Sequence, residues 1–276
     1  MTDYQRTLKK AFKLSGIGLH KGKKVTIRAK PAPVNTGITF KRVDLTPHVK
    51  ITAHISSVQI TELSTTLVSG STKIATIEHL MAAFYACEVD NALIEIDSEE
   101  VPILDGSSKD FFDEIESVGS EEQNELRQSL NLNRYTSITE QDKIIEFKPH
   151  KEKTLIIDYC ISFPQSQIIG KQNFKFELTK ENFKEICSAR TFCRLEDVKF
   201  MQERGLALGG SLDNAIVVDR EKVLNHDGLR FEKEFVKHKI LDCLGDISLL
   251  GHRFYGHIKV FKGGHALHHK LTQALL

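Results

Sequence analysis

The feature that most constrains the fold is an order of predicted elements that occurs twice, once at the end of each half of the chain. Residues 76–117 read as a helix, an alternating strand, a glycine-containing turn and a second helix, and residues 235–276 read in the same order. Predicted antiparallel strands precede both segments. Because the apolar face of a sheet must be buried under another layer, this order predicts two similar α+β domains, each with helices covering one face of its sheet.

Hydrophobic patterning predicts the individual elements. Apolar residues recur at helical spacing in residues 76–87, whereas they alternate as in half-buried strands in residues 25–29 and 91–96. Further helices are predicted at 105–115, 180–188, 196–204, 231–250 and 266–276, and further strands at 8–14, 38–43, 130–139, 143–147, 154–163, 173–177 and 257–261. The polar segment 119–125 lacks apolar anchors, which predicts a linker between domains at 1–120 and 127–276.

Charge and cysteine content bound the class of protein. Lys+Arg 38 against Asp+Glu 37 gives a formal net charge of +1, which argues against nucleic acid as a partner. The five cysteines are odd in number and form no Cys-x-x-Cys pair, which favours free thiols in a reducing compartment and disfavours a thiolate zinc site. No signal segment and no apolar run of roughly 20 residues occurs. We therefore expect a soluble, cytoplasmic protein.

A histidine and an aspartate stand four residues apart inside the long predicted helix near the C-terminus. This spacing places the side chains of His238 and Asp242 on one face, one turn apart, where both could bind one metal ion. With His79 as a third ligand, they would leave one position open on zinc, as in catalytic sites. The residues alone leave another interpretation open, because His238 and Asp242 could form an ordinary polar pair and His79 could be a satisfied buried histidine.

Glu78 and His265 are the acid–base candidates beside such a metal. Adjacent helical side chains diverge by about 100°, so His79 could bind metal while Glu78 reaches a water molecule on it. His265 follows two glycines at a predicted helix start, where the helix dipole disfavours a cation. It therefore needs a nearby carboxylate, and Asp246 is the candidate, one turn beyond Asp242. The alternatives are a surface carboxylate for Glu78 and a simple cap for His265.

Two lysines add positive charge to this region. Lys239 stands between the two ligand candidates on the helix, and Lys262 directly precedes the glycine pair. Such cations suit a developing oxyanion or a diphosphate, although neither usual glycine-rich nucleotide-binding signature occurs. His268 and His269 are predicted to lie at the surface. Taken alone, these residues predict a metal-assisted hydrolase with an anionic substrate.

Eight short motifs then occur in an order that resembles one enzyme family. They are Ser15-Gly-Ile-Gly-Leu-His20, Thr76-Ile-Glu-His79, Pro102-Ile-Leu-Asp-Gly-Ser107, Ala189-Arg-Thr-Phe192, Gly209-Gly-Ser211, Asp227-Gly-Leu-Arg230, His238-Lys239-x-x-Asp242 and Gly264-His265. From about residue 5 to its end, the chain resembles the UDP-3-O-acyl-N-acetylglucosamine deacetylase family, the zinc amidases of lipid A synthesis. No single motif is decisive, and their common order makes the resemblance specific.

The resemblance implies one catalytic Zn²⁺ ion and a set of roles around it. The implied ligands are His79, His238 and Asp242. Glu78 would be the general base, and His265, oriented by Asp246, would be an acid and electrostatic partner. Thr191 would donate a hydrogen bond to the oxyanion, with the cation of Lys239 close by. The family layout further implies that helices of both domains pack between two outer sheets, with the site at the domain junction.

The resemblance also implies the substrate contacts. Phe192 would lie beside the substrate, and His20 near the edge of the acyl site. Residues 193–213 would form the wall of an apolar passage for a fatty acyl chain, with Val198 and Met201 on one stripe of its helix. Without the family, ordinary core packing explains that stripe. The implied reaction releases acetate from UDP-3-O-acyl-N-acetylglucosamine, and we expect the enzyme to be a monomer.

Two other functions are compatible with the residues alone. A zinc metallopeptidase, or another metal-dependent amidase, would use the same ligands but would tolerate loss of Lys239 and Lys262, because its substrate has no diphosphate. A non-catalytic scaffold of two domains would contain no stoichiometric zinc.

Overall fold

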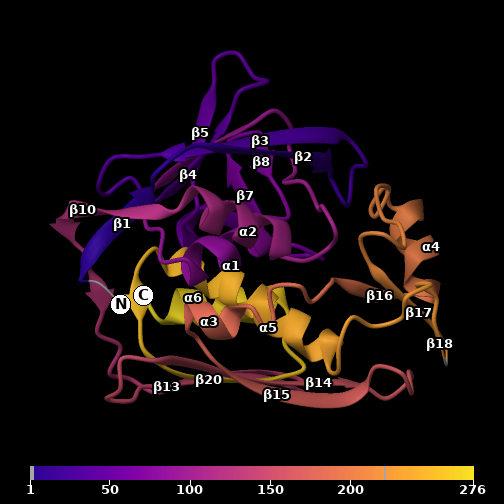
Figure 1. Ribbon diagram of the computed structural model, residues 1–276. Helices are drawn as coiled ribbons and strands as arrows, with labels where there is room; N and C mark the ends of the chain where they lie inside the picture. Colours follow the sequence, from indigo (N-terminus) through magenta and orange to yellow (C-terminus); the bar gives the residue numbers. More distant parts are fainter. Residues whose placement is uncertain (1–2, 221) are drawn as a thin grey trace.

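Two five-stranded sheets form the outer layers of the molecule, and helices fill the space between them (Figure 1). The computed structural model describes residues 3–220 and 222–276. The first sheet contains, in order, β2 (Phe12–Ile17), β3 (Lys24–Pro31), β9 (Ala92–Ile96), β4 (Ile38–Arg42) and β5 (Val49–Thr52). The second contains β12 (Thr136–Glu140), β13 (Lys143–Lys148), β20 (Gly256–Phe261), β14 (Leu155–Phe163) and β15 (Gly170–Glu177).

The two sheets share one strand order. In each five-stranded sheet, the strand that comes last in the sequence lies between the strands that come second and third in the sequence. Thus β9 pairs antiparallel with β3 and parallel with β4, and β20 pairs in the same way with β13 and β14. This confirms the α+β class and the repeated order that the sequence predicts. The domain boundaries at 1–120 and 127–276 stay a prediction.

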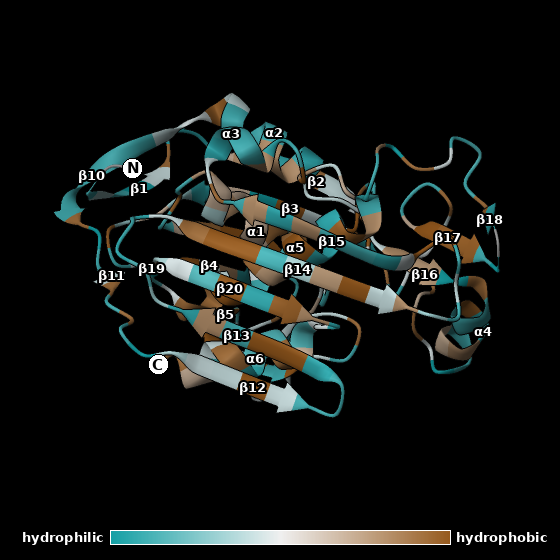
Figure 2. Ribbon diagram, turned by 90° about the horizontal axis from the view of Figure 1, so that it is seen from below, coloured by the Kyte–Doolittle hydropathy of each residue, from teal (hydrophilic) through white to brown (hydrophobic). Residues whose placement is uncertain are grey.

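Alternation along the strands explains why helices cover only one face of each sheet. In β14, the side chains of Leu155, Ile157, Tyr159 and Ile161 are buried, and the residues between them are partly exposed. Figure 2 looks onto the outer face of this sheet, with helices behind it. The inner faces of both sheets therefore contribute to the core that surrounds the helices.

Helices from both halves meet in this central layer. They are α1 (Glu78–Ala86), α2 (Lys109–Val118), α3 (Lys180–Phe183), α5 (Glu234–Ile247), its 3₁₀ extension η2 (Ser248–Leu250), and α6 (His265–Ala274). Every residue of α1 is buried, and α1 packs along α5. A Cβ atom at Gly245 would lie 2.1 Å from the carbonyl oxygen of Glu78, so only glycine allows these backbones to approach so closely.

Two small sheets flank the central layer, and the sequence pattern predicts neither. They contain β6 (Val58–Ile60), β7 (Thr66–Ser69) and β8 (Thr72–Ile74) in the first half, after the 3₁₀ helix η1 (Ile55–Ser57), and β16 (Phe192–Arg194), β17 (Ile216–Asp219) and β18 (Lys222–Val223) in the second. The predicted helix at 196–204 is confirmed as α4 (Leu195–Glu203), which lies between β16 and β17 along the chain.

The glycine turn after α4 docks on the first half of the chain. The backbone N–H of Gly209 donates to the carbonyl of Leu19 at 2.9 Å, and that of Leu208 donates to the carbonyl of His20 at 3.1 Å. A Cβ atom at Gly209 would lie 2.2 Å from the carbonyl oxygen of Gly18. Two of the motifs, distant in sequence, therefore meet through their glycines.

The polar segment 119–125, for which the sequence predicts a linker, is a strand instead. β10 (Ser120–Leu126) pairs antiparallel with β1 (Tyr4–Leu8). Its side chains are exposed or half-buried, so its composition has no apolar alternation to reveal it. The predicted strand 130–139 is also divided, into β12 and the short β11 (Ser129–Leu130), which pairs with β19 (Arg253–Phe254). The helix predicted at 180–188 is shorter in the structure, where α3 ends at Phe183.

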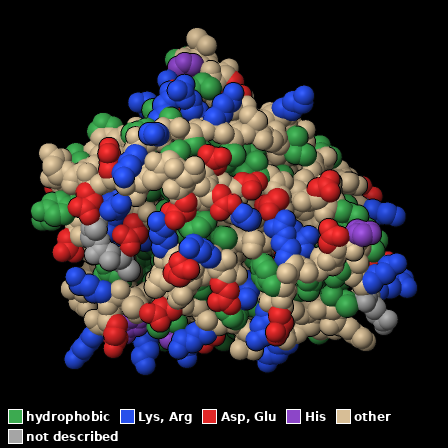
Figure 3. Space-filling model, in the orientation of Figure 1, with side chains coloured by type: hydrophobic (Ala, Val, Ile, Leu, Met, Phe, Trp, Pro, Cys, Tyr) green, Lys and Arg blue, Asp and Glu red, His purple; other side chains and the backbone are tan. Residues whose placement is uncertain are grey.

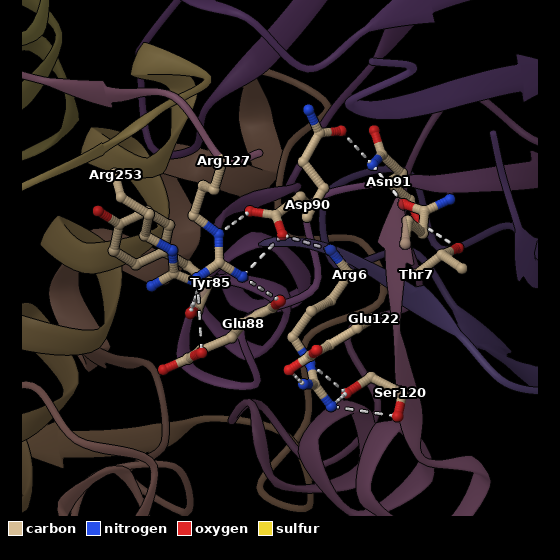
Figure 4. A network of polar contacts seen from close by, with 12 residues as sticks. Arg6, Thr7, Tyr85, Glu88, Asp90, Asn91, Ser120, Glu122, Arg127 and Arg253 are labelled. Carbon is tan, nitrogen blue, oxygen red and sulfur yellow. Dashed lines mark hydrogen bonds and ion pairs between the residues drawn. The ribbon is translucent and has the colours of Figure 1, made fainter. Parts of the chain in front are cut away.

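A polar network ties this region to the C-terminal end of α1 (Figure 4). The carboxylate of Asp90 accepts the backbone N–H of Arg6 at 2.7 Å and two N–H groups of Arg127 at 2.8 and 2.9 Å. The guanidinium of Arg253 lies 3.9 Å from the ring centroid of Tyr85. Charged groups thus fix the segment that connects the two halves. This network lies at the C-terminal end of α1, and Glu78 lies at the opposite end of that helix.

Candidate metal centre and active site

The three predicted metal ligands come together between α1 and α5. His79, His238 and Asp242 are buried. Asp242 Oδ1 lies 3.3 Å from His238 Nε2 and 3.5 Å from His79 Nε2. Neighbouring ligands on a tetrahedral ion with bonds of about 2.0–2.1 Å are separated by roughly 3.3–3.4 Å. This donor set therefore fits one tetrahedral metal ion, with a position left for water or substrate.

Surrounding contacts select the ligand atoms. His238 Nδ1 donates to the carbonyl oxygen of Ala189 at 3.0 Å, which leaves Nε2 free to bind metal. Lys239 Nζ donates to Asp242 Oδ2 at 2.7 Å and leaves Oδ1 toward the histidines. Burial lowers the pKa of His238 to about 3, so its ring is neutral, as a metal ligand must be.

Glu78 begins α1, beside the ligand His79. Its Oε2 accepts the backbone N–H of Thr65 at 3.1 Å, and its Oε1 lies 3.9 Å from His265 Nε2. Burial raises the pKa of Glu78, although the nearby imidazoles of His265 and His79 oppose the shift. A carboxylate with a raised pKa is suited to accept a proton near neutral pH.

A turn with positive φ leads into α1 and connects it to the glycine motif of the first hairpin. Thr76 has a φ of 59°, which is uncommon for a β-branched residue, and its hydroxyl donates to Glu100 Oε1 at 3.0 Å. The carboxylate of Glu100 also accepts the backbone N–H of His20 at 2.8 Å and of Lys21 at 3.0 Å. Neither ring nitrogen of His20 has a hydrogen-bond partner among the described residues.

A second cluster lies one turn further along α5. Asp246 Oδ2 accepts hydrogen bonds of 2.8 Å from Nδ1 of both His265 and His268, and Oδ1 accepts the hydroxyl of Thr65 at 2.5 Å. Burial lowers the pKa of His265, but the charge and hydrogen bond of Asp246 outweigh it and raise that pKa to about 9. His265 is therefore a cation at neutral pH, as its predicted role requires.

The prediction that His268 lies at the surface is wrong. Its side chain is 0% exposed, and its Nε2 lies 3.1 Å from the Tyr159 hydroxyl. His268 follows His265 by three residues, so the same face of α6 presents both rings to Asp246. His269, on another face of the helix, is half-buried. The i, i+3 spacing of His265 and His268 could have indicated this position, and it is the same kind of signal that identified His238 and Asp242.

The site opens into two adjoining cavities. A polar cavity of about 340 Å³ is lined by Glu78, His79, His238, Asp242 and His265, among others. A larger cavity of about 720 Å³ has mostly apolar walls, including Phe192, Leu195, Val198, Phe200 and Met201, and His20 also lines it. Thr191, Phe192, His238 and Lys239 line both cavities. A reacting group at the metal position could therefore have an apolar chain next to it.

Ion pairs hold the segment that carries Thr191. Arg190 Nε donates to Glu234 Oε1 at 2.8 Å, and both side chains are buried. Arg230 binds Asp105 at 2.7 Å. Several motif residues therefore join one motif to another and to the start of α5, without lying at the metal position themselves.

The two predicted cations have different surroundings. Lys239 lines both cavities and contacts Asp242. Lys262 Nζ pairs with Asp142 Oδ2 at 2.5 Å, and Lys262 is not among the described residues that line either cavity. Lys143 of β13 lines the polar cavity instead. No motif or spacing in the sequence singles out Lys143, because its position depends on how the second sheet meets α6.

This arrangement can bind a metal ion, accept a proton from water and return a proton to a leaving group. Those are the requirements of metal-assisted hydrolysis. The fold and the site together define a metal-dependent hydrolase.

Comparison with known proteins identifies its family. Residues 5–276 match the LpxC family, UDP-3-O-acyl N-acetylglycosamine deacetylase. A protein from Idiomarina loihiensis named UDP-3-O-acyl-N-acetylglucosamine deacetylase is 44% identical over 275 residues, which cover 99% of this chain and 89% of the relative. Proteins of that name from Actinobacillus pleuropneumoniae serotype 3 and Geobacter sp. (strain M21) are also 44% identical over 99% of this chain, and over 90% and 89% of their own lengths.

The chain belongs to this deacetylase family. It is a deacetylase of lipid A biosynthesis and hydrolyses an amide bond. This confirms the family that the eight ordered motifs predict, and it removes the scaffold and metallopeptidase alternatives.

Proposed function

We propose that the chain removes the acetyl group from UDP-3-O-acyl-N-acetylglucosamine and that its resident metal is one Zn²⁺ ion. The observation that carries this proposal is the buried triangle of His79, His238 and Asp242, with separations of 3.3 and 3.5 Å, directly beside Glu78. Two imidazoles and a carboxylate are ligands that zinc accepts in catalytic sites. When bound, the ion would polarise the acetamide carbonyl and make water a stronger nucleophile.

We assign the proton transfers to two side chains. Glu78 accepts a proton from the water whose oxygen forms the new bond to the acetyl carbon. The carbon–nitrogen bond then breaks, and the leaving amine takes a proton from His265. The proton accepted by Glu78 then returns to His265, directly or through water, which restores both the base and the acid. Two pKa shifts suit these roles. Burial raises the pKa of Glu78, which makes its carboxylate a stronger base, and Asp246 raises the pKa of His265 despite burial, which keeps that ring protonated.

Thr191 and Lys239 are the proposed partners of the negative charge that develops on the acetyl oxygen. Both line the polar cavity at the ligand cluster. Preorganised donors in a buried site stabilise such charge strongly. Lys239 would also serve the diphosphate, together with Lys143. Lys262 could bind a diphosphate only after its ion pair with Asp142 breaks.

The apolar cavity is the proposed site of the 3-O-acyl chain. Val198 and Met201 contribute to its wall from α4, and Phe192 lies where the cavity meets the metal position. His20 lines the same cavity with two ring nitrogens that have no partner among the described residues. A polar substrate group near the sugar could supply the missing hydrogen bond.

We further propose a cytoplasmic monomer with a small-molecule substrate. Within the described part of the chain, no helix is long and apolar enough to cross a membrane, and the five cysteines are free thiols, as a reducing compartment permits. On the face shown in Figure 3, Lys and Arg side chains are interspersed with Asp and Glu, which does not favour nucleic acid as a partner.

The test is a substrate series that varies in acyl length and in the presence of UDP. Val198→Asp should reduce kcat/KM most for long acyl chains, because each buried methylene contributes about 0.8 kcal/mol. Lys239→Ala should weaken substrates of every acyl length, with a loss that depends on UDP. Lys199→Asp, on the exposed side of the same helix, is the matched control. Equal losses at every length for Val198→Asp would overturn the assignment of the cavity.

A further inference from the structure

His268 is a buried histidine in the second cluster that the proposed reaction does not use. It is 0% exposed, and it is not among the described residues lining either cavity. Its Nδ1 lies 2.8 Å from Asp246 Oδ2, and its Nε2 lies 3.1 Å from the hydroxyl of Tyr159 on β14, which is also 0% exposed. Both ring nitrogens are therefore satisfied, although the ring does not reach the substrate.

The chemistry of the partners fixes the direction of these hydrogen bonds. An ionised carboxylate only accepts, so His268 Nδ1 donates to Asp246. In a neutral ring the other nitrogen must then accept, so the Tyr159 hydroxyl donates to Nε2. Burial lowers the pKa of His268 and raises that of Tyr159 well above its usual value, which keeps both groups neutral. Tyr159 thus selects the tautomer of His268 that donates to Asp246.

A glycine makes room for this arrangement. A Cβ atom at Gly263 would lie 2.7 Å from the Tyr159 hydroxyl oxygen and 3.3 Å from His268 Nε2. The first glycine of the Gly263-Gly264-His265 motif therefore has a packing role. It allows the turn before α6 to pass over the Tyr159–His268 contact.

The carboxylate of Asp246 is held by three donors. His265 and His268 donate to Oδ2, and Thr65 donates to Oδ1. With donors on both oxygens, the carboxylate cannot rotate without losing a hydrogen bond. Its fixed plane orients the ring of His265, whose Nε2 then lies 3.9 Å from the carboxylate of Glu78.

We propose that His268, with its tautomer fixed by Tyr159, is a positioning residue for the acid–base pair of His265 and Glu78. It holds the Asp246 carboxylate in the one orientation that points His265 Nε2 toward the reacting groups. This inference rests on the proposed role of His265.

The test compares two substitutions at His268 in the metal-loaded, full-length enzyme. His268→Leu removes the donor to Asp246, whereas His268→Asn places an amide N–H close to the former Nδ1. We expect His268→Leu to lower kcat roughly 10–100-fold, as loss of an orienting partner does, with KM and metal content unchanged. His268→Asn should recover most of kcat. An unchanged kcat in His268→Leu, or equal losses in both variants, would overturn the proposal.

Proton NMR spectroscopy provides a second test, which does not require the leucine variant to fold. The Nδ1 proton of His265, held between ring and carboxylate, should give a far-downfield proton resonance. We expect it to persist in His268→Asn and to shift or broaden in Tyr159→Phe, which removes only the outer hydroxyl. A resonance unaffected by Tyr159→Phe would count against the role of Tyr159 in fixing His268. His269→Asn, at the next position, is the matched control and should leave kcat and the resonance unchanged.

The variant His265→Ala separates this inference from the function on which it rests. Full kcat in His265→Ala would remove the acid role of His265 and the proposed mechanism with it. A large loss in His265→Ala together with full kcat in His268→Leu would overturn only the positioning role of His268.

Discussion

Helix α5 carries two buried clusters of identical composition, one turn apart, and their geometries suit different chemistry. Each contains two histidines and one aspartate, with Asp242 in the first and Asp246 in the second. In the first, the imidazole nitrogens lie 3.3 and 3.5 Å from the carboxylate oxygen, a spacing that fits ligands around a metal. In the second, the distances are 2.8 Å, and the contacts are hydrogen bonds.

The partners of each carboxylate account for the difference. Asp242 already pairs with the cation of Lys239, and burial lowers the pKa of the adjacent His238 to about 3. Among the described residues, the other donors to Asp246 besides His265 are the neutral His268 and Thr65. Despite burial, the negative charge of Asp246 raises the pKa of His265 to about 9. The same residue types therefore give a neutral histidine, the proposed ligand, in one cluster and a cationic histidine, the proposed acid, in the other. Residue composition alone does not distinguish a metal site from a proton-transfer site.

The largest effect should come from the first cluster. His238→Ala should abolish stoichiometric metal binding and lower activity by more than the roughly 100-fold that loss of an outer partner costs. Metal analysis and a deacetylation assay measure the two effects, with His269→Ala as the control. A variant that kept a full equivalent of metal would show that the triangle is not the metal site.

The next effect should separate metal binding from proton transfer. Glu78→Gln retains the shape of the side chain but cannot accept a proton, so we expect metal content to stay and kcat to fall about 10²–10⁴-fold. The acidic limb of the rate–pH profile should also disappear from the residual activity. If Glu78→Gln worked at the wild-type rate, another group would have to be the base.

A smaller effect concerns pH and the second cluster. The pKa of His265 is about 9 in the folded protein and 6.5 for an unperturbed histidine. Because the folded value is raised, the ion pair with Asp246 stabilises the fold fully below about pH 6.5, and this contribution is lost as pH rises through about 9. The free energy of unfolding, measured with urea, should fall more steeply over this window in wild type than in His265→Gln. Parallel curves for the two proteins would contradict a raised pKa.

The smallest effect should come from the third donor to Asp246. Thr65→Val preserves shape but removes the hydroxyl that binds Asp246 Oδ1. Two histidine donors remain, so we expect kcat to fall by about 10-fold, the lower end for an orienting contact, with metal content unchanged. Thr66→Val, at the adjacent buried threonine, is the control. Loss of metal in Thr65→Val would mean that the two clusters are not independent.

The sequence predicts those parts of the site that follow from helix geometry. The spacing of His238, Asp242 and Asp246 fixes their common face. The same rule at i+3 places His268 on the face of His265, a signal that the prediction of a surface position overlooks. The proximity of His79 to α5 does not follow from any spacing, because it depends on how two helices pack. Only the ordered motifs, through the resemblance to a family, predicted that His79 lies in the same site as His238 and Asp242.

The sequence predicts the fold well where elements are long and one-sided, and poorly where they are short or polar. The alternation in β14 and the repeated order of the halves are both predicted. The small sheets escape prediction because their strands have two to four residues, too few for a period to be seen. β10 escapes because backbone pairing with β1 forms it, without apolar side chains.

The glycine at position 245 has a consequence for how this enzyme could be inactivated. Gly245 touches no substrate in the proposed mechanism, yet the carbonyl of Glu78 lies where its Cβ would be. A single added methyl group there would push α1 away from α5 and move the proposed base and one proposed ligand relative to the other two proposed ligands. A genetic screen should therefore recover alleles at Gly245 alongside alleles at the ligands.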